Sequence, residues 1–177
     1  WETAVHVGSP QIRNLGTVGG NVVNASVAGD SPTTFLTYGA QVVLKSAGGE
    51  RVMTIEDFNK GPGNCAIRPD ELLTEIRFPA LSGDEAVGYF KIGKRKSLAI
   101  VVLAVAIYIK RTPDNKVEDC RVVLGAVSKH PMRSPELEAL LKGRALTRQS
   151  LDDTLPAFTD AVQAAIPTRP SVVYKRE

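Results

Sequence analysis

LAIVVLAVAIYIK, residues 98–110, is the segment that decides the fold of the C-terminal half of this chain. It is rich in Val and Ile, which favour strands, and it is shorter than the roughly 20 apolar residues that a membrane-spanning helix needs. Residues 87–92 before it and 117–128 after it have the same character, and residues 112–116 have a turn composition. The three runs predict an antiparallel meander of three strands.

Two helices are predicted after this meander. Residues 134–142 form the first, with Gly143 as its stop. Residues 147–165 form the second, which Pro156 interrupts unless the helix begins there. A sheet followed by helices predicts an α+β domain over residues 84–177.

Residues 1–81 contain shorter elements. A helix is expected over residues 32–38, since a proline follows a capping residue and Gly39 stands at its end. Residues 40–54 predict a hairpin around two glycines, and residues 72–78 alternate as a strand does. We place the boundary between the two predicted domains at residues 80–85.

The composition of the chain excludes several classes of protein. With 177 residues, 43% of them hydrophobic, and a net charge of +3, the chain is expected to be globular. Cys65 and Cys120 cannot supply the four thiolates of an iron–sulfur cluster or of a Cys-only zinc site, so no metal site is predicted. Few cysteines suit a reducing cytoplasm, the predicted location. Spread basic residues and the lack of a long apolar run predict neither a nucleic-acid partner nor a membrane span.

Common catalytic motifs are missing from the sequence. It contains no phosphate-binding loop of the Gly-Lys-Ser/Thr kind, no Gly-x-Gly-x-x-Gly fingerprint and no Gly-x-Ser-x-Gly elbow. Only two histidines, His6 and His130, are present, and no cysteine is near either of them in sequence. Nucleophilic catalysis therefore has little support.

A glycine-rich stretch is the most distinctive feature, and we expect it to be a loop. Residues 16–21 read GTVGGN, and Asp30 follows nine residues after Asn21. Adjacent glycines let backbone amides approach an anion, and a carboxylate can accept a hydrogen bond from a sugar hydroxyl. That chemistry suits a dinucleotide. The same residues also fit a tight turn in which Asp30 caps the next helix, and spacing alone favours the turn.

Taken together, the motifs of this chain resemble those of one family. Residues 8–14, 17–21 and 25–32 resemble the second FAD-binding motif in the flavin subunit of molybdenum hydroxylases, a family that includes xanthine dehydrogenase, aldehyde oxidoreductase and carbon monoxide dehydrogenase. The resemblance continues through residues 61–63, 68–76 and 89–95. It implies the second α/β subdomain of the FAD-binding (PCMH-like) fold, followed by the family's C-terminal domain.

The resemblance also implies a role for each residue of an FAD site. Ser26 and Asp30 would bond the cofactor's sugar region, Leu72 and Leu73 would pack against the isoalloxazine, and Lys91 would lie near its polar edge, where a cation favours reduced flavin. Without the resemblance, the two leucines would be ordinary strand core and the lysine a solvated strand end. The residues expected along the phosphates and ribityl chain are Gly16, Thr17, Val18, Gly19, Gly20 and Asn21.

The sequence departs from the family pattern in two places. Val27 stands where such subunits usually carry Pro. The family's first FAD motif, a glycine-rich loop in an N-terminal subdomain, is missing, so we expect the chain to be a piece of a longer subunit. Lys94, Arg95 and Lys96 are either a solvated loop or, in the resemblance, a positive patch beside the flavin that attracts NAD phosphates.

The implied function is electron transfer. The subunit would pass electrons from [2Fe-2S] clusters on a partner through FAD to NAD or another acceptor, while hydroxylation takes place on a large molybdopterin subunit. Xanthine dehydrogenase is the predicted type, and carbon monoxide and aldehyde dehydrogenases are alternatives. Two further alternatives are another FAD oxidoreductase of the same superfamily and a non-catalytic assembly domain that has lost half of the FAD site.

Overall fold

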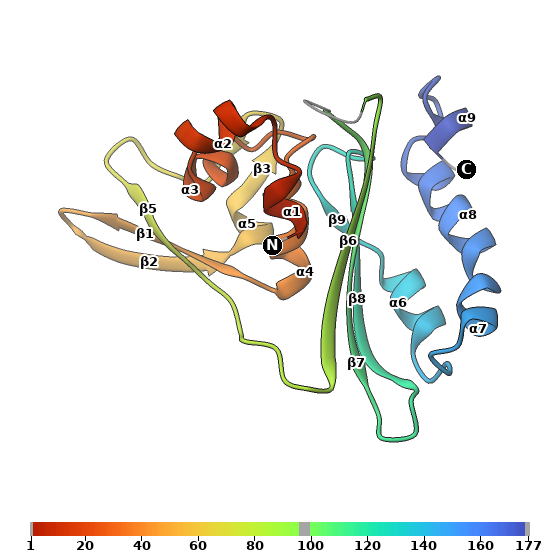
Figure 1. The fold of residues 1–177 in the computed structure, drawn as a ribbon. Helices are drawn as coiled ribbons and strands as arrows, with labels where there is room; N and C mark the ends of the chain where they lie inside the picture. The colour runs from red at the N-terminus through yellow and green to blue at the C-terminus, as the bar shows by residue number, and fades with distance from the viewer. Residues whose placement is uncertain (1, 96–99, 176–177) are drawn as a thin grey trace.

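The computed structural model describes residues 2–95 and 100–175, and Figure 1 shows three layers. A four-stranded sheet stands in the middle. Helices and a small sheet from the first 81 residues lie on one face of it, and the C-terminal helices lie on the other. This mixed architecture, with segregated helices and antiparallel sheets, confirms the predicted α+β class. None of the helices in the described ranges is long and apolar enough to cross a membrane.

The structure describes five helices within residues 2–81, and two of them lie within or next to the stretch predicted to be a loop. The stretch expected to be a loop contains helical residues, because Ser9 and Thr17 each cap a helix start by accepting a hydrogen bond from a backbone N–H three residues on. The loop prediction is therefore wrong for residues 18–21. The helices are α1 (Glu2–Val5), α2 (Pro10–Leu15), α3 (Val18–Val23), α4 (Asp30–Tyr38) and α5 (Ile55–Phe58).

Helix α4 ends as the sequence predicts. Gly39 adopts a left-handed conformation with φ of 67° and donates its N–H to the carbonyl of Leu36. The helix begins two residues earlier than predicted, with Gly29 as its N-cap and Asp30 in the first turn. The interpretation of Asp30 as the capping residue is therefore wrong.

The first half contains a small antiparallel sheet of order β2-β1-β5 and a two-stranded ribbon. The predicted hairpin and the predicted strand near residue 72 are confirmed. Opposite Val43 and Leu44, the pairing of β1 with β5 shifts by one residue at Thr74. Since this bulge reverses the alternation, Leu73 and Ile76 both pack against the core. The strands are β1 (Gln41–Ser46), β2 (Gly49–Thr54), β3 (Asn59–Gly61), β4 (Asn64–Cys65) and β5 (Leu72–Arg77).

The central sheet has the order β6-β7-β8-β9, and every pairing in it is antiparallel. Its first three strands are the predicted meander, and the two-residue β9 adds a fourth that was not predicted. The part of the predicted second strand before residue 100 lies outside the described residues. The strands are β6 (Glu85–Gly93), β7 (Val101–Arg111), β8 (Val117–Gly125) and β9 (Met132–Arg133).

The C-terminal helices cover one face of this sheet. The predicted second helix is divided in two, because Pro156 lies in the first turn of a new helix, where a missing N–H is harmless. Leu137 and Leu141 pack against β8, and Val162 packs against Leu103 and Leu124. The helices are α6 (Pro135–Leu141), α7 (Arg148–Asp152), α8 (Leu155–Ala165) and α9 (Val172–Lys175).

Helix α4 covers the opposite face and joins the two halves into one packed body. Val123 of β8 belongs to the same buried cluster as Val22 and Leu36 of the first half. The approach is close at Gly125, where an added Cβ would lie 2.6 Å from the hydroxyl oxygen of Thr33. Side chains from the two predicted domains therefore pack directly against each other. The domain boundary between residues 81 and 84 stays a prediction.

Candidate cofactor site

The glycine-rich segment is a short helix start with an exposed surface. The side-chain oxygen of Thr17 accepts a hydrogen bond of 2.9 Å from the N–H of Gly20. A Cβ on Gly20 would lie 2.9 Å from that oxygen, and a Cβ on Gly16 would lie 2.9 Å from the carbonyl oxygen of Ile12. Both glycines therefore serve local packing. The other N–H groups of the first turn of α3 have no acceptor within the helix.

This helix lies against the beginning of β5, which brings two groups of predicted site residues together. A Cβ on Gly19 would lie 3.4 Å from Cδ2 of Leu73. Leu73 packs partly into the core, whereas Leu72 is 72% exposed, and Val18 and Leu15 are 55% and 89% exposed. Exposed apolar side chains thus flank the glycine segment, an arrangement that can receive a ligand with both a phosphate and an apolar ring.

Asn21 carries an unsatisfied polar atom. Its Oδ1 is buried and has no hydrogen-bond partner in the described part of the chain. Buried polar atoms are nearly always paired, and a missing partner calls for an explanation such as an absent ligand. Ser26 is different, because its hydroxyl oxygen already accepts a hydrogen bond of 3.2 Å from the N–H of Ala28. That bond fixes the turn between α3 and α4.

Asp30 and Lys91, to which the sequence gives separate roles, form a buried ion pair. Lys91 Nζ lies 3.0 Å from Asp30 Oδ2 and donates a second hydrogen bond of 2.8 Å to the carbonyl oxygen of His6. Both charged side chains are 8% exposed. The interpretation of Lys91 as a solvated strand end is therefore wrong. The pair connects α4 and β6 with the segment that follows α1.

Tyr89 completes this cluster, and sequence reasoning missed it. Its hydroxyl donates a hydrogen bond of 2.6 Å to Asp30 Oδ1. Burial, and then the contact with the Asp30 carboxylate, raise the pKa of the tyrosine far above its usual value, so it remains a donor. The signal that could have found it is the two-residue period of a strand, which places Tyr89 and Lys91 on one face of β6.

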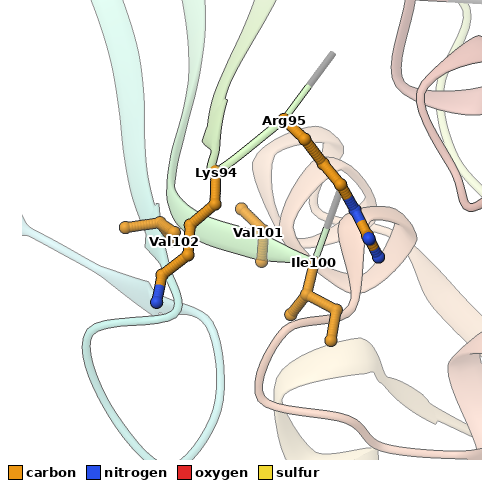
Figure 2. Close-up of a pocket in the computed structure, with 5 residues that line it drawn as sticks. All are labelled: Lys94, Arg95, Ile100, Val101 and Val102. Carbon is orange, nitrogen blue, oxygen red and sulfur yellow. The ribbon is translucent and has the colours of Figure 1, made fainter. Parts of the chain in front are cut away.

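The basic segment after β6 borders a separate hollow. Figure 2 shows Lys94 and Arg95 near Ile100, Val101 and Val102, which together line a cavity of about 380 Å³. Lys94 and Arg95 lie beside an apolar wall here, and their role as a positive patch beside the flavin stays a prediction. Lys96, the third residue of that prediction, lies outside the described residues.

A glycine-rich helix start beside the exposed end of a strand suits a cofactor-binding subunit, and comparison with known families shows which class this is. Residues 2–81 match the family model described as the FAD-binding domain in molybdopterin dehydrogenase, and residues 88–177 match that of the CO dehydrogenase flavoprotein C-terminal domain. This chain belongs to the family of FAD-binding medium subunits of molybdenum hydroxylases. The resemblance that the sequence motifs indicate is thereby confirmed.

Known relatives carry out different reactions. The nicotinate dehydrogenase FAD-subunit of Eubacterium barkeri is 38% identical over 100% of this chain and 61% of that protein. The xanthine dehydrogenase FAD-binding subunit of Escherichia coli O157:H7 is 31% identical over 95% of this chain and 56% of its own length. A carbon monoxide dehydrogenase structure from Hydrogenophaga pseudoflava superimposes with a TM-score of 0.85 at 26% identity, covering 99% of this chain and 60% of the other. The chain thus spans about 60% of the length of such relatives.

Proposed function

We propose that this chain supplies one wall of an FAD site in a subunit that relays electrons. The observation that carries the proposal is the buried, unpartnered Oδ1 of Asn21, next to a glycine-rich helix start. A hydroxyl of the ribityl chain or ribose is a donor of the kind that this oxygen lacks. The first-turn N–H groups of Val18 and Gly19, which have no acceptor within the helix, suit a phosphate, so the residues present fit the cofactor.

The roles proposed for the other residues follow from their positions. Val18 and Gly19 would present backbone N–H groups to the pyrophosphate, and Thr17 holds the helix start in place. Leu72 would cover the isoalloxazine, since its side chain is exposed beside α3. When bound, FAD supplies the capacity to take up electrons and pass them on. None of these side chains has to move a proton.

Asp30 has acceptor positions left for a sugar hydroxyl while it holds Lys91, although its side chain is only 8% exposed. Its carboxylate has about four acceptor positions, and Tyr89 and Lys91 occupy two of them. Because the charge of Lys91 is balanced by Asp30, we expect it to affect the flavin potential less than an unpaired lysine would. Ser26 would donate its hydroxyl proton to the sugar region, while its oxygen accepts from Ala28 and holds the turn that leads to Asp30.

Membership of the family is the basis on which we propose the partners, the electron acceptor, the location and the substrate type. The partners would be a [2Fe-2S] subunit and a large molybdopterin subunit, NAD would be the acceptor near Lys94 and Arg95, and the location would be the cytoplasm. The xanthine dehydrogenase type is one candidate. The nicotinate dehydrogenase type is a second, favoured by 38% identity to that subunit against 31% to the xanthine dehydrogenase subunit. Assaying the assembled enzyme with both heterocycles and an aldehyde decides between them.

The FAD proposal is tested with the complete subunit and an Asn21→Leu variant. We expect the wild-type subunit to bind FAD, and the variant to bind it about tenfold more weakly, because one hydrogen bond of about 1.4 kcal/mol is lost. The variant is not expected to lose stability without FAD, since an apolar side chain of similar size replaces one whose buried Oδ1 is unpaired. The matched control is Asn24→Leu, at the exposed end of the same helix. A wild-type subunit that takes up no FAD would overturn the proposal.

A further inference from the structure

An ion pair between a buried glutamate and a partly exposed arginine, Glu71 and Arg51, lies immediately before Leu72. Arg51 Nε donates a hydrogen bond of 2.6 Å to Glu71 Oε1, and Arg51 Nη2 donates one of 2.7 Å to Glu71 Oε2. The side chain of Glu71 is only 4% exposed. Two parallel hydrogen bonds between a guanidinium and a carboxylate fix orientation as well as distance. The pair therefore sets the direction in which the chain enters β5.

The same pair also holds the loop that precedes β5. Arg51 Nη2 donates a hydrogen bond of 2.5 Å to the carbonyl oxygen of Ala66, and the N–H of Arg68 donates one of 2.8 Å to Glu71 Oε2. Further back in this loop, the N–H of Gly63 donates to the carbonyl oxygen of Ala25, just after α3. One loop is thus tied to the glycine-rich helix at one end and to the Arg51–Glu71 pair at the other.

Holding Leu72 in place buries little apolar surface within the described structure. Its side chain is 72% exposed, whereas its neighbour Leu73 reaches the core and the α3 surface. The bulge at Thr74 limits how β5 can shift along β1. Burying the Glu71 carboxylate beside an exposed leucine has a cost, because its desolvation offsets part of its attraction to Arg51. A ligand that needs the leucine in one position would account for this cost beyond the hydrogen bonds to Ala66 and Arg68.

We infer that Arg51 and Glu71 are positioning residues that preset Leu72 as a wall for the flavin ring. Neither residue contacts the cofactor in this arrangement; both act through the direction of the chain at the start of β5. The inference rests on the proposed function, since it assumes that FAD binds at this surface. It extends that function to two residues on β2 and in the loop before β5.

The test is a double-mutant cycle in the complete subunit, with FAD affinity as the measurement. Leu72→Ala is expected to weaken binding about fivefold through lost apolar contact. Glu71→Gln leaves Arg51 without its anionic partner, and we expect a loss of about five- to tenfold. If Glu71 acts through Leu72, the two losses do not multiply. The FAD affinity of the double variant is then at most about twofold below that of whichever single variant binds FAD less tightly.

A merely structural role gives a different result. In that case the two effects multiply to roughly 25- to 50-fold, and the inference is wrong. Glu50→Gln is the matched control, because Glu50 lies on the same strand as Arg51 but forms only exposed ion pairs with Lys45 and Arg77. Affinity in the control should stay within about twofold of wild type.

A second variant keeps the inference testable if Glu71→Gln does not fold. Arg51→Lys retains the positive charge but loses the two-pronged geometry, and it should weaken FAD binding with the same dependence on Leu72. Failure of the inference is distinguishable from failure of the proposed function. If the wild-type subunit binds no FAD, the proposed function is wrong. If the wild type binds FAD but the losses in the variants are additive, only the inference about Arg51 and Glu71 is wrong.

Discussion

Replacing Lys91 by Met gives the sharpest test of the buried ion pair. In the wild type, Lys91 is bonded to Asp30 and to the carbonyl oxygen of His6, and both charged side chains are almost inaccessible to water. Methionine has a similar volume but no charge, so the Asp30 carboxylate would remain buried with only the Tyr89 hydroxyl as a side-chain partner. The substitution therefore isolates the cost of an uncompensated charge.

The expected cost can be worked out from the geometry. Removing one partner of a buried pair costs about 3–5 kcal/mol. Because Tyr89 still donates to Asp30, we expect the lower end, about 3 kcal/mol. For a protein of this size each kcal/mol lowers Tm by about 2–4 °C, so the expected decrease is about 6–12 °C.

Thermal and urea unfolding of the purified subunit, followed by circular dichroism, measure this change. The double variant Asp30→Asn/Lys91→Met removes both charges and should recover more than half of the loss. Lys94→Met, at an exposed position just after the same strand, is the control and should change Tm little. If Lys91→Met is as stable as the control, or if the double variant is no more stable than Lys91→Met, the ion pair does not join the elements as argued.

Three further predictions concern packing, pH and the helix cap. Gly125→Ala should lower the free energy of unfolding by about 1–3 kcal/mol, while Gly88→Ala, whose Cβ meets no atom within 4 Å, should change it little; urea unfolding compares them. The Arg51 guanidinium lowers the pKa of the Glu71 carboxyl from 4.5 to about 2. Glu71 therefore stabilises the protein fully above about pH 4.5, and the difference in Tm between wild type and Glu71→Gln should disappear as the pH falls toward 2. Thr17→Val should cost about 1 kcal/mol by removing the cap of α3, and Thr17→Ser should not.

The long elements could be predicted from the sequence, and the short ones could not. The strands β6, β7 and β8 extend over many residues, so their apolar pattern and the turn between the last two are visible. Helices α2 and α3 have six residues each, too few for a helical period, and their glycines and asparagines suggest a loop. Only their caps, Ser9 and Thr17, could have revealed them. Strand β9 has two residues and exists because of its pairing with β8.

The candidate site shows the same limit at the level of side chains. The glycine segment and Leu73 could be predicted as one site only through family resemblance, since nothing in the spacing indicates that residues 19 and 73 touch. The Asp30–Lys91 pair spans 61 positions and depends on how the two halves pack. Arg51 and Glu71 are ordinary surface charges by composition, and only the fold of the loop buries the glutamate.

The close contact between Thr33 and Gly125 restricts how these subunits can evolve. One residue comes from the half that matches the FAD-binding domain and the other from the half that matches the C-terminal domain, and there is no room between them for an added methyl group. A side chain at position 125 has to be accompanied by a smaller residue at position 33, so the two positions should vary together among relatives. Hybrid subunits that combine halves from different relatives should fold only when this pair is inherited together.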